Sequence, residues 1–430
     1  MKCPIVKGTF DILPQETKKE DLWKESHRWA YVEQVLCEEA IKYGFREIRT
    51  PIFERTELFE RGVGESSDIV SKEMYTFLDR KGRSLSLRPE GTASVVRAFI
   101  SNHLYQTPGV HKFFYIGSMF RYERPQAGRY RELHQFGVEA IGAMHPYQDV
   151  ELIDLMYQIY RKLGLKNLSI SINSVGDNSS RTAYQAALLS YLTPHKDQLS
   201  EDSQIRLKKN ILRILDSKLD QDQKILKNAP LISEYLSKEA KEHFQIILQE
   251  LDRLEIPYQV EPKLVRGLDY YSNTVFEITS GQLGTQNAVG AGGRYDRLVA
   301  DLGGPDLPAT GFAIGIERLL QTMLKQKAFF PSPSKPDLFF IPMNNQAAQL
   351  AFNLTTKLKH KNIAAQMDLS GKKIQHGLQL ANLLQATAIA VVGDDEIHSE
   401  KITCKKLATC ESYAFSIQNL TDNLKGWLNV

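Results

Sequence analysis

Two segments with the alternation of β-strands, HKFFYIGSMFRYERP and RELHQFGVEAIG, follow each other with only a short loop between them. Strands joined so closely pair antiparallel, because a parallel pair needs a long crossover connection. Another stretch, KEMYTFLDRKGRSLSLRPEG, has the pattern of a hairpin. The sequence therefore predicts an α+β fold built on an antiparallel sheet flanked by helices.

The sequence pattern changes near residue 330. The stretch FFPSPSKPD has three prolines and two serines in nine positions, which is typical of a linker. Residues 176–255 are almost wholly helical in pattern, and strands alternate with helices after the linker. We expect a first domain over 1–325 with a helical insertion at about 176–255. A linker over 326–336 and a small, largely parallel α/β domain over 337–430 follow.

Three further segments carry local expectations. FREIRTPIFERTELF is expected to be extended, because Pro51 excludes a helix around it. GTQNAVGAGGRYDRLVADLGG is expected to form a glycine-rich turn that leads to a helix. ATGFAIGIERLLQTML has the pattern of a strand that runs directly into a helix.

Composition excludes several classes of protein. With 42% hydrophobic and 24% charged residues and a net charge of +3, the chain is ordinary for a soluble globular protein, and nucleic-acid binding would have to come from local patches. The four cysteines form no CxxC pair, so no zinc site is expected. No secretory signal and no run of roughly 18 apolar residues is found, so we expect a cytoplasmic protein with no membrane partner.

Four arginines, Arg121, Arg124, Arg129 and Arg131, fall within eleven residues, with only Glu123 as a counter-charge. Guanidinium groups so close together repel one another unless an anion binds between them. A phosphate-rich ligand is one interpretation, and a solvated charged loop is the other.

The period of two puts Arg121, Glu123, Gln135 and Glu139 on one face of the predicted hairpin, interrupted by glycines. Glycine inside a strand often marks the close approach of another group, so this face has the character of the floor of a binding site. The pattern alone is equally compatible with a solvated sheet face.

Other polar motifs are distributed along the chain. LRPEGTA places Glu90 and Thr92 around a turn, where a carboxylate and a hydroxyl suit an ammonium group. LVRGLDYYSNTVFEI carries Arg266, Tyr270 and Tyr271, and GFAIGIERLL carries two glycines shortly before Arg318. Each motif is weak alone, because glycines before a helix are commonly a matter of packing.

Together these motifs resemble the class II aminoacyl-tRNA synthetases, and specifically the histidyl-tRNA synthetase family. GFREIRTPIFERTELFERGVGESSDIVSKEMYTFLDRKGRSLSLRPEGTA, MFRYERPQAGRYRELHQFGVEAIG and ATGFAIGIERLL resemble the three class motifs, in that order. RGLDYYSNTVFEI and GGRYDRLV resemble the two histidine-specific signatures. The chain departs from the family pattern at Arg297, where glycine is usual, and at Leu133, where a phenylalanine usually packs on adenine.

The resemblance implies that the chain activates histidine with ATP and Mg²⁺ to histidyl-adenylate and pyrophosphate, and then transfers histidine to its tRNA. It also implies a homodimer, an anticodon-binding C-terminal domain and no metal site formed by the protein alone. Lys372, Lys373, Lys405 and Lys406 are the expected phosphate contacts of that domain.

The expected site residues divide by ligand. The catalytic group comprises Arg121, Arg266 and Arg318. The histidine pocket comprises Glu90, Thr92, Gln135, Glu139, Tyr270 and Tyr271, with Glu139 as the imidazole acceptor and Tyr271 as its partner. ATP would contact Arg121, Glu123, Leu133 and Arg318, whereas tRNA would contact Arg124, Gln126 and Arg129.

Two other classes of protein are alternatives to a synthetase. A catalytically silent paralogue that binds histidine and regulates a biosynthetic enzyme would resemble the core, but would usually lack the C-terminal domain and parts of the signatures. A dinucleotide or P-loop enzyme does not fit, because GAGGRYD lacks the lysine and the spacing of a phosphate-binding loop.

Overall fold

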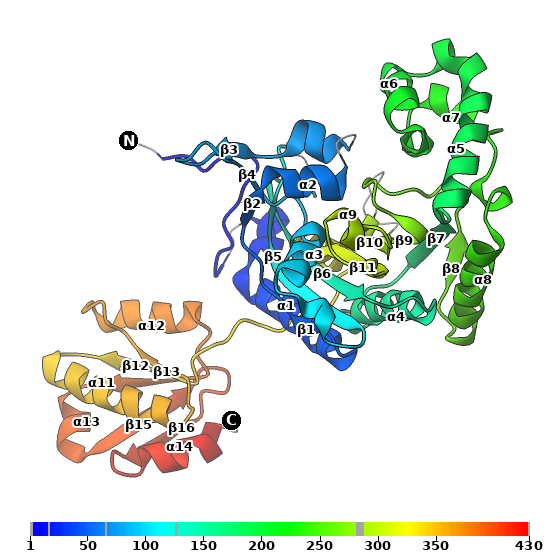
Figure 1. Cartoon of the computed structure of the whole chain (residues 1–430). Coiled ribbons are helices and arrows are strands. Elements are labelled where there is room, and N and C mark those ends of the chain that lie inside the picture. The colour runs from blue at the N-terminus through cyan, green and yellow to red at the C-terminus, as the bar shows by residue number, and fades with distance from the viewer. Residues whose placement is uncertain (1–2, 16–17, 65–66, 125–127, 281–287, 429–430) are drawn as a thin grey trace. The chain divides into compact units, whose positions relative to one another are not determined.

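The computed structural model describes residues 3–15, 18–64, 67–124, 128–280 and 288–428. The chain divides into two compact units, Met1–Pro331 and Ser332–Val430 (Figure 1). Each unit has its own sheet and its own buried core, and each is described separately below.

The first unit is organised around a sheet in which eight strands are seen among the described residues. In spatial order they are β1 (Arg46–Glu47), β5 (His111–Phe120), β6 (Glu132–Ile141), β11 (Ala309–Gly315), β10 (Ala288–Arg294), β9 (Ser272–Ser280), β7 (Leu168–Ser174) and β8 (Tyr258–Val260). Neighbours pair antiparallel except at the two edges, where β1 with β5 and β7 with β8 are parallel. The predicted antiparallel sheet, with β5 and β6 as a hairpin, is confirmed.

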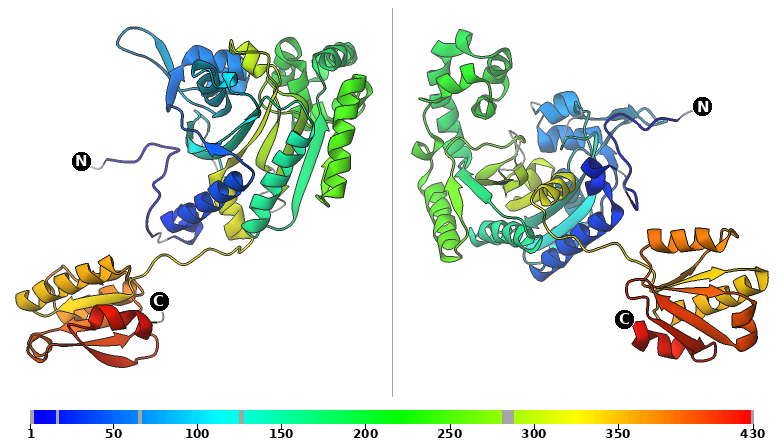
Figure 2. Two further views of the ribbon diagram at one scale, coloured as in Figure 1. Left: turned by 60° about the horizontal axis from the view of Figure 1, so that its bottom comes forward. Right: turned by 180° about the vertical axis from the view of Figure 1, so that it is seen from behind.

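One face of this sheet is covered by helices. They are α1 (Ser26–Lys42), α4 (Tyr147–Lys162), α8 (Lys238–Arg253) and α10 (Ile316–Lys325), and Figure 2 shows α1, α4 and α8 on the same side of the strands. Phe136, Phe276 and Ile314 from three strands are fully buried against these helices. Burial of such a side chain stabilises the fold by about 1.5–3 kcal/mol, so this layer fixes the position of each strand.

The other face is covered only in part. Helices α2 (Thr56–Val63), α3 (Thr92–Ser101) and α9 (Leu298–Asp301) pack near the β5 end, together with a small sheet of β2 (Phe53–Arg55), β4 (Ser84–Leu87) and β3 (Thr76–Leu78). The hairpin expected in KEMYTFLDRKGRSLSLRPEG is the β3–β4 pair. The partly uncovered middle of this face includes Gln135 of β6 and the glycines Gly311 and Gly315 of β11.

Two local expectations were wrong. The stretch expected to be extended up to Phe59 includes α2, whose Leu58, Phe59 and Val63 lie at helical spacing and are buried; Pro51 constrains only the residues before it. The expected glycine-rich turn contains strand β10, where a side chain at Gly290 would clash with Tyr160 of α4, so the glycine allows close packing of helix on sheet.

Helices α5 (Asn178–Leu192), α6 (Glu201–Lys209) and α7 (Asp220–Leu226) form an arm beside β7 and β9 (Figure 1). They have a core of their own, which includes the fully buried Leu188, Ile214 and Leu226. Helix α8 instead contributes Ile247 and Leu251 to the main core. The range of the insertion stays a prediction, and the name insertion arm is used below for residues 178–226.

The second unit is a five-stranded sheet with helices on it. Its order is β13 (Ala365–Met367), β12 (Leu338–Pro342), β14 (Ala388–Val392), β15 (Lys401–Lys406) and β16 (Ser412–Ser416), with helices α11 (Asn345–His360), α12 (Ile374–Leu383), α13 (Asp394–Ser399) and α14 (Leu420–Leu428). The first three strands are parallel, as expected from the alternation of strands and helices. The last two strands form an antiparallel hairpin that the sequence analysis did not anticipate.

Candidate active site

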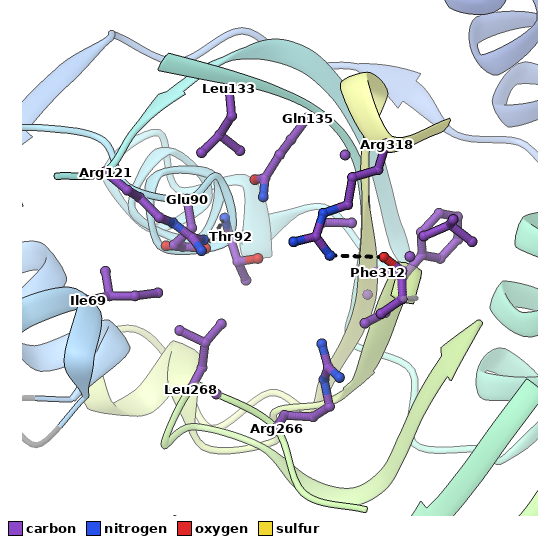
Figure 3. Close-up of a pocket in the computed structure, with 18 of the residues that line it drawn as sticks. Ile69, Glu90, Thr92, Arg121, Leu133, Gln135, Arg266, Leu268, Phe312 and Arg318 are labelled. Carbon is purple, nitrogen blue, oxygen red and sulfur yellow. Dashed lines mark hydrogen bonds between the residues drawn. The ribbon is translucent and has the colours of Figure 1, made fainter. Parts of the chain in front are cut away.

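A cavity of about 280 Å³ lies on the partly uncovered face of the sheet in the first unit. Its walls come from the start of α3, the ends of β5 and β6, the loop before β9, the glycines of β10 and β11, and the start of α10. Most of the expected site residues line it: Glu90, Thr92, Arg121, Glu123, Arg129, Leu133, Gln135, Arg266, Tyr270, Tyr271 and Arg318. Segments more than 200 residues apart in sequence therefore converge on one hollow (Figure 3).

Three arginines reach into this hollow from different sides (Figure 3). Arg121 Nε donates to the Pro89 carbonyl at 2.8 Å, and Arg318 donates to the carbonyls of Gly128 and Ala288, each at 3.0 Å. Arg266 Nη1 lies 2.6 Å from Oε2 of Glu277 on β9. Since each guanidinium is already oriented by the protein, little reorganisation is needed when an anion binds.

The electrostatics of the cavity favour an anion. The pKa of Arg318 is lowered by burial and then by the like charges of Arg129 and Arg121, with Glu123 acting in the opposite direction. Those cations are therefore close enough to repel one another. A ligand with several negative charges would remove that repulsion, as a triphosphate does.

The arginine cluster of the sequence separates into distinct environments. Arg129 pairs with Glu123 at 3.2 Å, and the guanidinium of Arg131 lies 4.1 Å from the centre of the Tyr122 ring. Arg124 is exposed and does not line the cavity. Gln126, the other residue expected to contact tRNA, lies outside the described residues.

Glu90 sits at the start of α3, where free backbone N–H groups are available. Its carboxylate accepts from the N–H groups of Thr92 at 2.7 Å and Ala93 at 2.9 Å. Burial raises the pKa of Glu90, while these hydrogen bonds and the charge of Arg121 act to lower it. A cationic ligand group beside this buried carboxylate would favour its charged form.

Glu139 lies behind the cavity wall rather than on its surface. It is 1% exposed, and its carboxylate accepts from Thr92 Oγ1 at 2.7 Å, from the Tyr295 hydroxyl, and from the Tyr115 hydroxyl at 3.4 Å. Burial raises the pKa of this carboxyl to about 8. Tyr271, the expected partner, lines the cavity instead, and the direct contact of Glu139 with an imidazole stays a prediction.

The glycines of the sheet have different neighbours. A side chain at Gly311 would meet the Glu139 carboxylate, and one at Gly137 would meet the Tyr115 ring, so the protein itself fills those spaces. Gly315, by contrast, lines the cavity with nothing within 4 Å of where its side chain would begin. Space for a ligand close to the backbone is therefore open at Gly315 and closed at Gly311.

Several lining residues were missed by the sequence analysis: Ile69, Tyr115, Leu268, Tyr295 and Glu317. The sequence did contain an indication for two of them, Tyr115 and Tyr295. Tyr115 is opposite Gly137 in the β5–β6 register, so extending the alternation two residues back from Gly117 would have found it. Tyr295 is part of GGRYD, which was noted without a role for its tyrosine. Arg297, the departure from the family pattern, has an ordinary helical backbone conformation at the start of α9.

Lysines of the second unit were the other expected site. Lys372 and Lys373 line a shallow hollow with His376 and Gln379 beside α12. Lys406 instead pairs with Glu411 at 3.1 Å and lies over the ring of Trp427. The expected four-lysine footprint is therefore split between the residues just before α12 and the end of β15.

Two other kinds of feature are absent from the described residues. The described residues contain no cluster of three or more His, Cys, Asp or Glu side chains able to hold a metal ion. None of the helices in the described part of the chain is both long and apolar enough to span a membrane.

Comparison with known proteins gives consistent matches along the whole chain. A sequence model described as histidyl-tRNA synthetase matches residues 8–319, and one described as an anticodon binding domain matches residues 337–427. A curated histidine–tRNA ligase from Protochlamydia amoebophila is 53% identical over 99% of this chain and 100% of its own length. One from Bacillus subtilis is 45% identical over 98% of each chain.

Solved structures show the same similarity. The apo histidyl-tRNA synthetase of S. aureus superimposes with a TM-score of 0.83 at 38% identity, covering 99% of this chain and all of the other. A Bacillus halodurans protein titled as an ATP phosphoribosyltransferase regulatory subunit/histidyl-tRNA synthetase shares the fold, with a TM-score of 0.61 at 21% identity over 90% of this chain and 99% of the other.

Proposed function

The chain belongs to the histidyl-tRNA synthetase family, and from this premise we propose which of its residues carry out each step of joining histidine to tRNA. The overall reaction is that of a histidine–tRNA ligase, a class II aminoacyl-tRNA synthetase. ATP and histidine form histidyl-adenylate and pyrophosphate, and the histidyl group then passes to the 3′ end of its tRNA. The observation that carries the residue assignments is the convergence of Arg121, Arg266 and Arg318 on a cavity that also contains Glu90 and Gln135.

The histidine end of the cavity is formed by polar groups around Thr92. Glu90, Thr92 and Gln135 surround the position proposed for the ammonium group. Tyr271 offers a hydroxyl to the imidazole, and Glu139 supports the pocket through Thr92 and Tyr295. Because a ligand without the matching hydrogen-bonding groups would leave these buried groups unpaired, selection can reach about 10⁴ without an editing site.

The arginines bind the triphosphate and stabilise charge during adenylate formation. As the histidine carboxylate attacks the α-phosphorus, negative charge grows on the α-phosphate oxygens, and Arg121 and Arg266 donate to them from opposite sides. Pyrophosphate leaves with the displaced electron pair, while Arg318 neutralises its charge. Loss of one preorganised donor in a comparable site lowers the rate by about 10²–10³.

The adenine subsite is proposed between Arg318 and the sheet at Leu133. Both residues line the cavity, and Gly315 leaves open space between β11 and α10. A guanidinium stacks well on a flat aromatic ring. Leucine supplies an apolar surface but no aromatic ring, so stacking at this position comes from the arginine side.

Acidic residues at the phosphate end fit a magnesium ion that enters with ATP. Glu123 lines the cavity, and burial together with the nearby Glu123 carboxylate raises the pKa of Glu73. Magnesium is usually held by one or two carboxylates plus substrate phosphates, which suits this donor set. When bound, the ion would offset phosphate charge, and Glu123 would hold it.

Contacts with tRNA are proposed for two regions. Arg124 is exposed and Arg129 is at the cavity edge, so both can meet the acceptor end near the adenylate. The second unit, whose residues 337–427 match an anticodon-binding model, would bind the anticodon through Lys372 and Lys373. Since aminoacylated tRNA is consumed in translation, the proposed location is the cytoplasm.

A homodimer is proposed through the small sheet of β2, β3 and β4. Ile52, Phe53, Phe77 and Leu78 are each between 44% and 70% exposed, and the rings of Phe53 and Phe77 are in edge contact. Such a cluster of exposed apolar side chains is typical of a surface that pairs with another chain. In a twofold dimer, this surface would pack against the same surface of a second copy of the chain.

The experiment that tests the assignment is pyrophosphate exchange by the full-length chain with each of the twenty amino acids. Exchange with histidine alone is expected, and Arg266→His is expected to nearly abolish it while circular dichroism stays unchanged. Unaltered exchange in Arg266→His would show that this arginine has no such role. A regulatory paralogue would instead show no exchange with any amino acid.

A further inference from the structure

The insertion arm contacts the loop of residues 264–271, which leads into β9 and carries Arg266 and Tyr271. We infer that Arg181, Asn210 and Arg213 of the arm are positioning residues that hold this loop in its working conformation. The inference rests on the proposed roles of Arg266 and Tyr271. It assigns the arm a part in histidine activation itself, in addition to any contact with tRNA.

Three hydrogen bonds connect the arm to every second residue of the loop. Arg213 Nη1 donates to the Gly267 carbonyl at 2.7 Å, and Arg181 Nη1 donates to the Tyr271 carbonyl at 2.9 Å. Between these two, Asn210 Nδ2 donates to Oδ1 of Asp269 at 2.7 Å. Two of the three acceptors are main-chain carbonyls, so the arm fixes the path of the backbone rather than one side chain.

The two sides of the loop face different spaces. Tyr270 lines only the active-site cavity, whereas Arg266, Leu268 and Tyr271 line both this cavity and a second one on the side of the arm. Asp269 lines the second cavity, of about 30 Å³, together with Arg181, Asn210 and Arg213. The loop therefore forms a wall between the arm and the substrate cavity, and a shift of its backbone would move Arg266 and Tyr271.

The same loop is also held from the α2 side. The Asp269 N–H donates to the Val63 carbonyl at 3.3 Å, and Asp68 pairs with Arg213 at 3.2 Å and with Arg206 at 3.5 Å. Arg213 thus joins the arm, the loop and the segment after α2 with one guanidinium. Its side chain is 11% exposed against 27% for Arg206, so its hydrogen bonds contribute more than those of the more exposed arginine.

This arrangement predicts a specific kinetic pattern. Release of the loop would reorient Tyr271, which is proposed to contact histidine, and Arg266, which is proposed to act on the α-phosphate. Arg121 directly follows β5 and Arg318 lies in α10, so their proposed ATP contacts would be unaffected. A looser arm should therefore raise the KM for histidine and lower kcat, with little change in the KM for ATP.

The test uses Arg213→Ala in the full-length chain, with Arg206→Ala as the matched control. Arg206 pairs with the same Asp68 and donates to the Arg213 carbonyl at 3.2 Å, but no hydrogen bond from it reaches the described residues of the loop. In pyrophosphate exchange, Arg213→Ala should lower kcat/KM for histidine by about tenfold or more, as for a lost hydrogen bond from a charged group. The KM of Arg213→Ala for ATP should stay within about twofold of the wild-type value. For Arg206→Ala, kcat and both KM values should stay within the same range.

Two further variants separate positioning from folding. Arg213→Lys keeps one charged donor and should recover part of the loss, and Asn210→Ala should give the same pattern on a smaller scale. A variant that only folds poorly would lose kcat while both KM values stay unchanged, and this pattern in Arg213→Ala and Asn210→Ala would overturn the inference. Wild-type kinetics in both would also overturn it. Arg266→His then distinguishes two cases. If this variant also exchanges pyrophosphate normally, the proposed role of the loop in catalysis is wrong. If it is inactive, that role stands and only the inference about the arm is wrong.

Discussion

The buried carboxyl of Glu139 should make the stability of the first unit depend strongly on pH. Its pKa is about 8 in the folded chain against 4.5 for an ordinary glutamate. Between these two values the unfolded chain has released a proton that the folded chain keeps, so the free energy of unfolding falls as pH rises. Each pH unit between the two pKa values contributes 1.36 kcal/mol, so the free energy of unfolding should fall by roughly 5 kcal/mol across the whole interval.

Glu139→Gln isolates this contribution, because the amide keeps the shape of the side chain and cannot ionise. Both chains would carry Trp427→Phe, so that Trp23 and Trp29, which are buried in the first unit, report its unfolding alone. Urea unfolding followed by tryptophan fluorescence from pH 5 to 9 gives the free energy at each pH. The parent should lose several kcal/mol relative to Glu139→Gln by pH 8. Curves that stay parallel over this range would refute the burial argument.

Three other changes test separate parts of the proposal. Arg318→Gln should lower kcat/KM for ATP by about 100-fold and leave the KM for histidine nearly unchanged; equal effects on the two substrates, measured by pyrophosphate exchange, would contradict the assignment. Removal of residues 332–430 should spare that exchange but weaken the charging of tRNA, so full charging by the truncated chain would exclude a role for the second unit. Phe53→Glu should yield monomers in analytical ultracentrifugation, whereas Arg80→Glu, a charge change at the tip of the β3–β4 hairpin, should not; dimers in both would place the interface elsewhere.

The periodic parts of the fold could be predicted from the sequence. Alternation in β5 and β6 identified the hairpin, and strands alternating with helices identified the second unit. The convergence of Arg121, Arg266 and Arg318 came from the family resemblance, since nothing local to a strand or helix indicates which distant segments meet. The fold class and the family are confirmed by the comparisons, while the individual roles remain predictions.

The errors have a common physical origin. Gly290 reads as a turn residue, but its lack of a side chain is required by Tyr160 on a helix far away in sequence. The alternation of side chains along β6 placed Glu139 on the floor of the site. It predicted correctly the face of the sheet on which Glu139 lies. Depth was not predictable, because Thr92, Tyr115 and Tyr295 cover that carboxylate from three different segments.

The ion pair between Arg266 and Glu277 has a consequence for which anions the protein accepts. Glu277 occupies only Nη1 of Arg266, and Nε is buried with no hydrogen-bond partner among the described residues, so a phosphate can bind the guanidinium while the ion pair stays in place. The carboxylate nevertheless balances part of the positive charge of Arg266, which weakens its attraction for a free phosphate. A nucleotide held also at its adenine end loses less, because its other contacts keep its phosphates near Arg266. Glu277 thus lowers the affinity of this end of the cavity for small anions that have no second point of attachment.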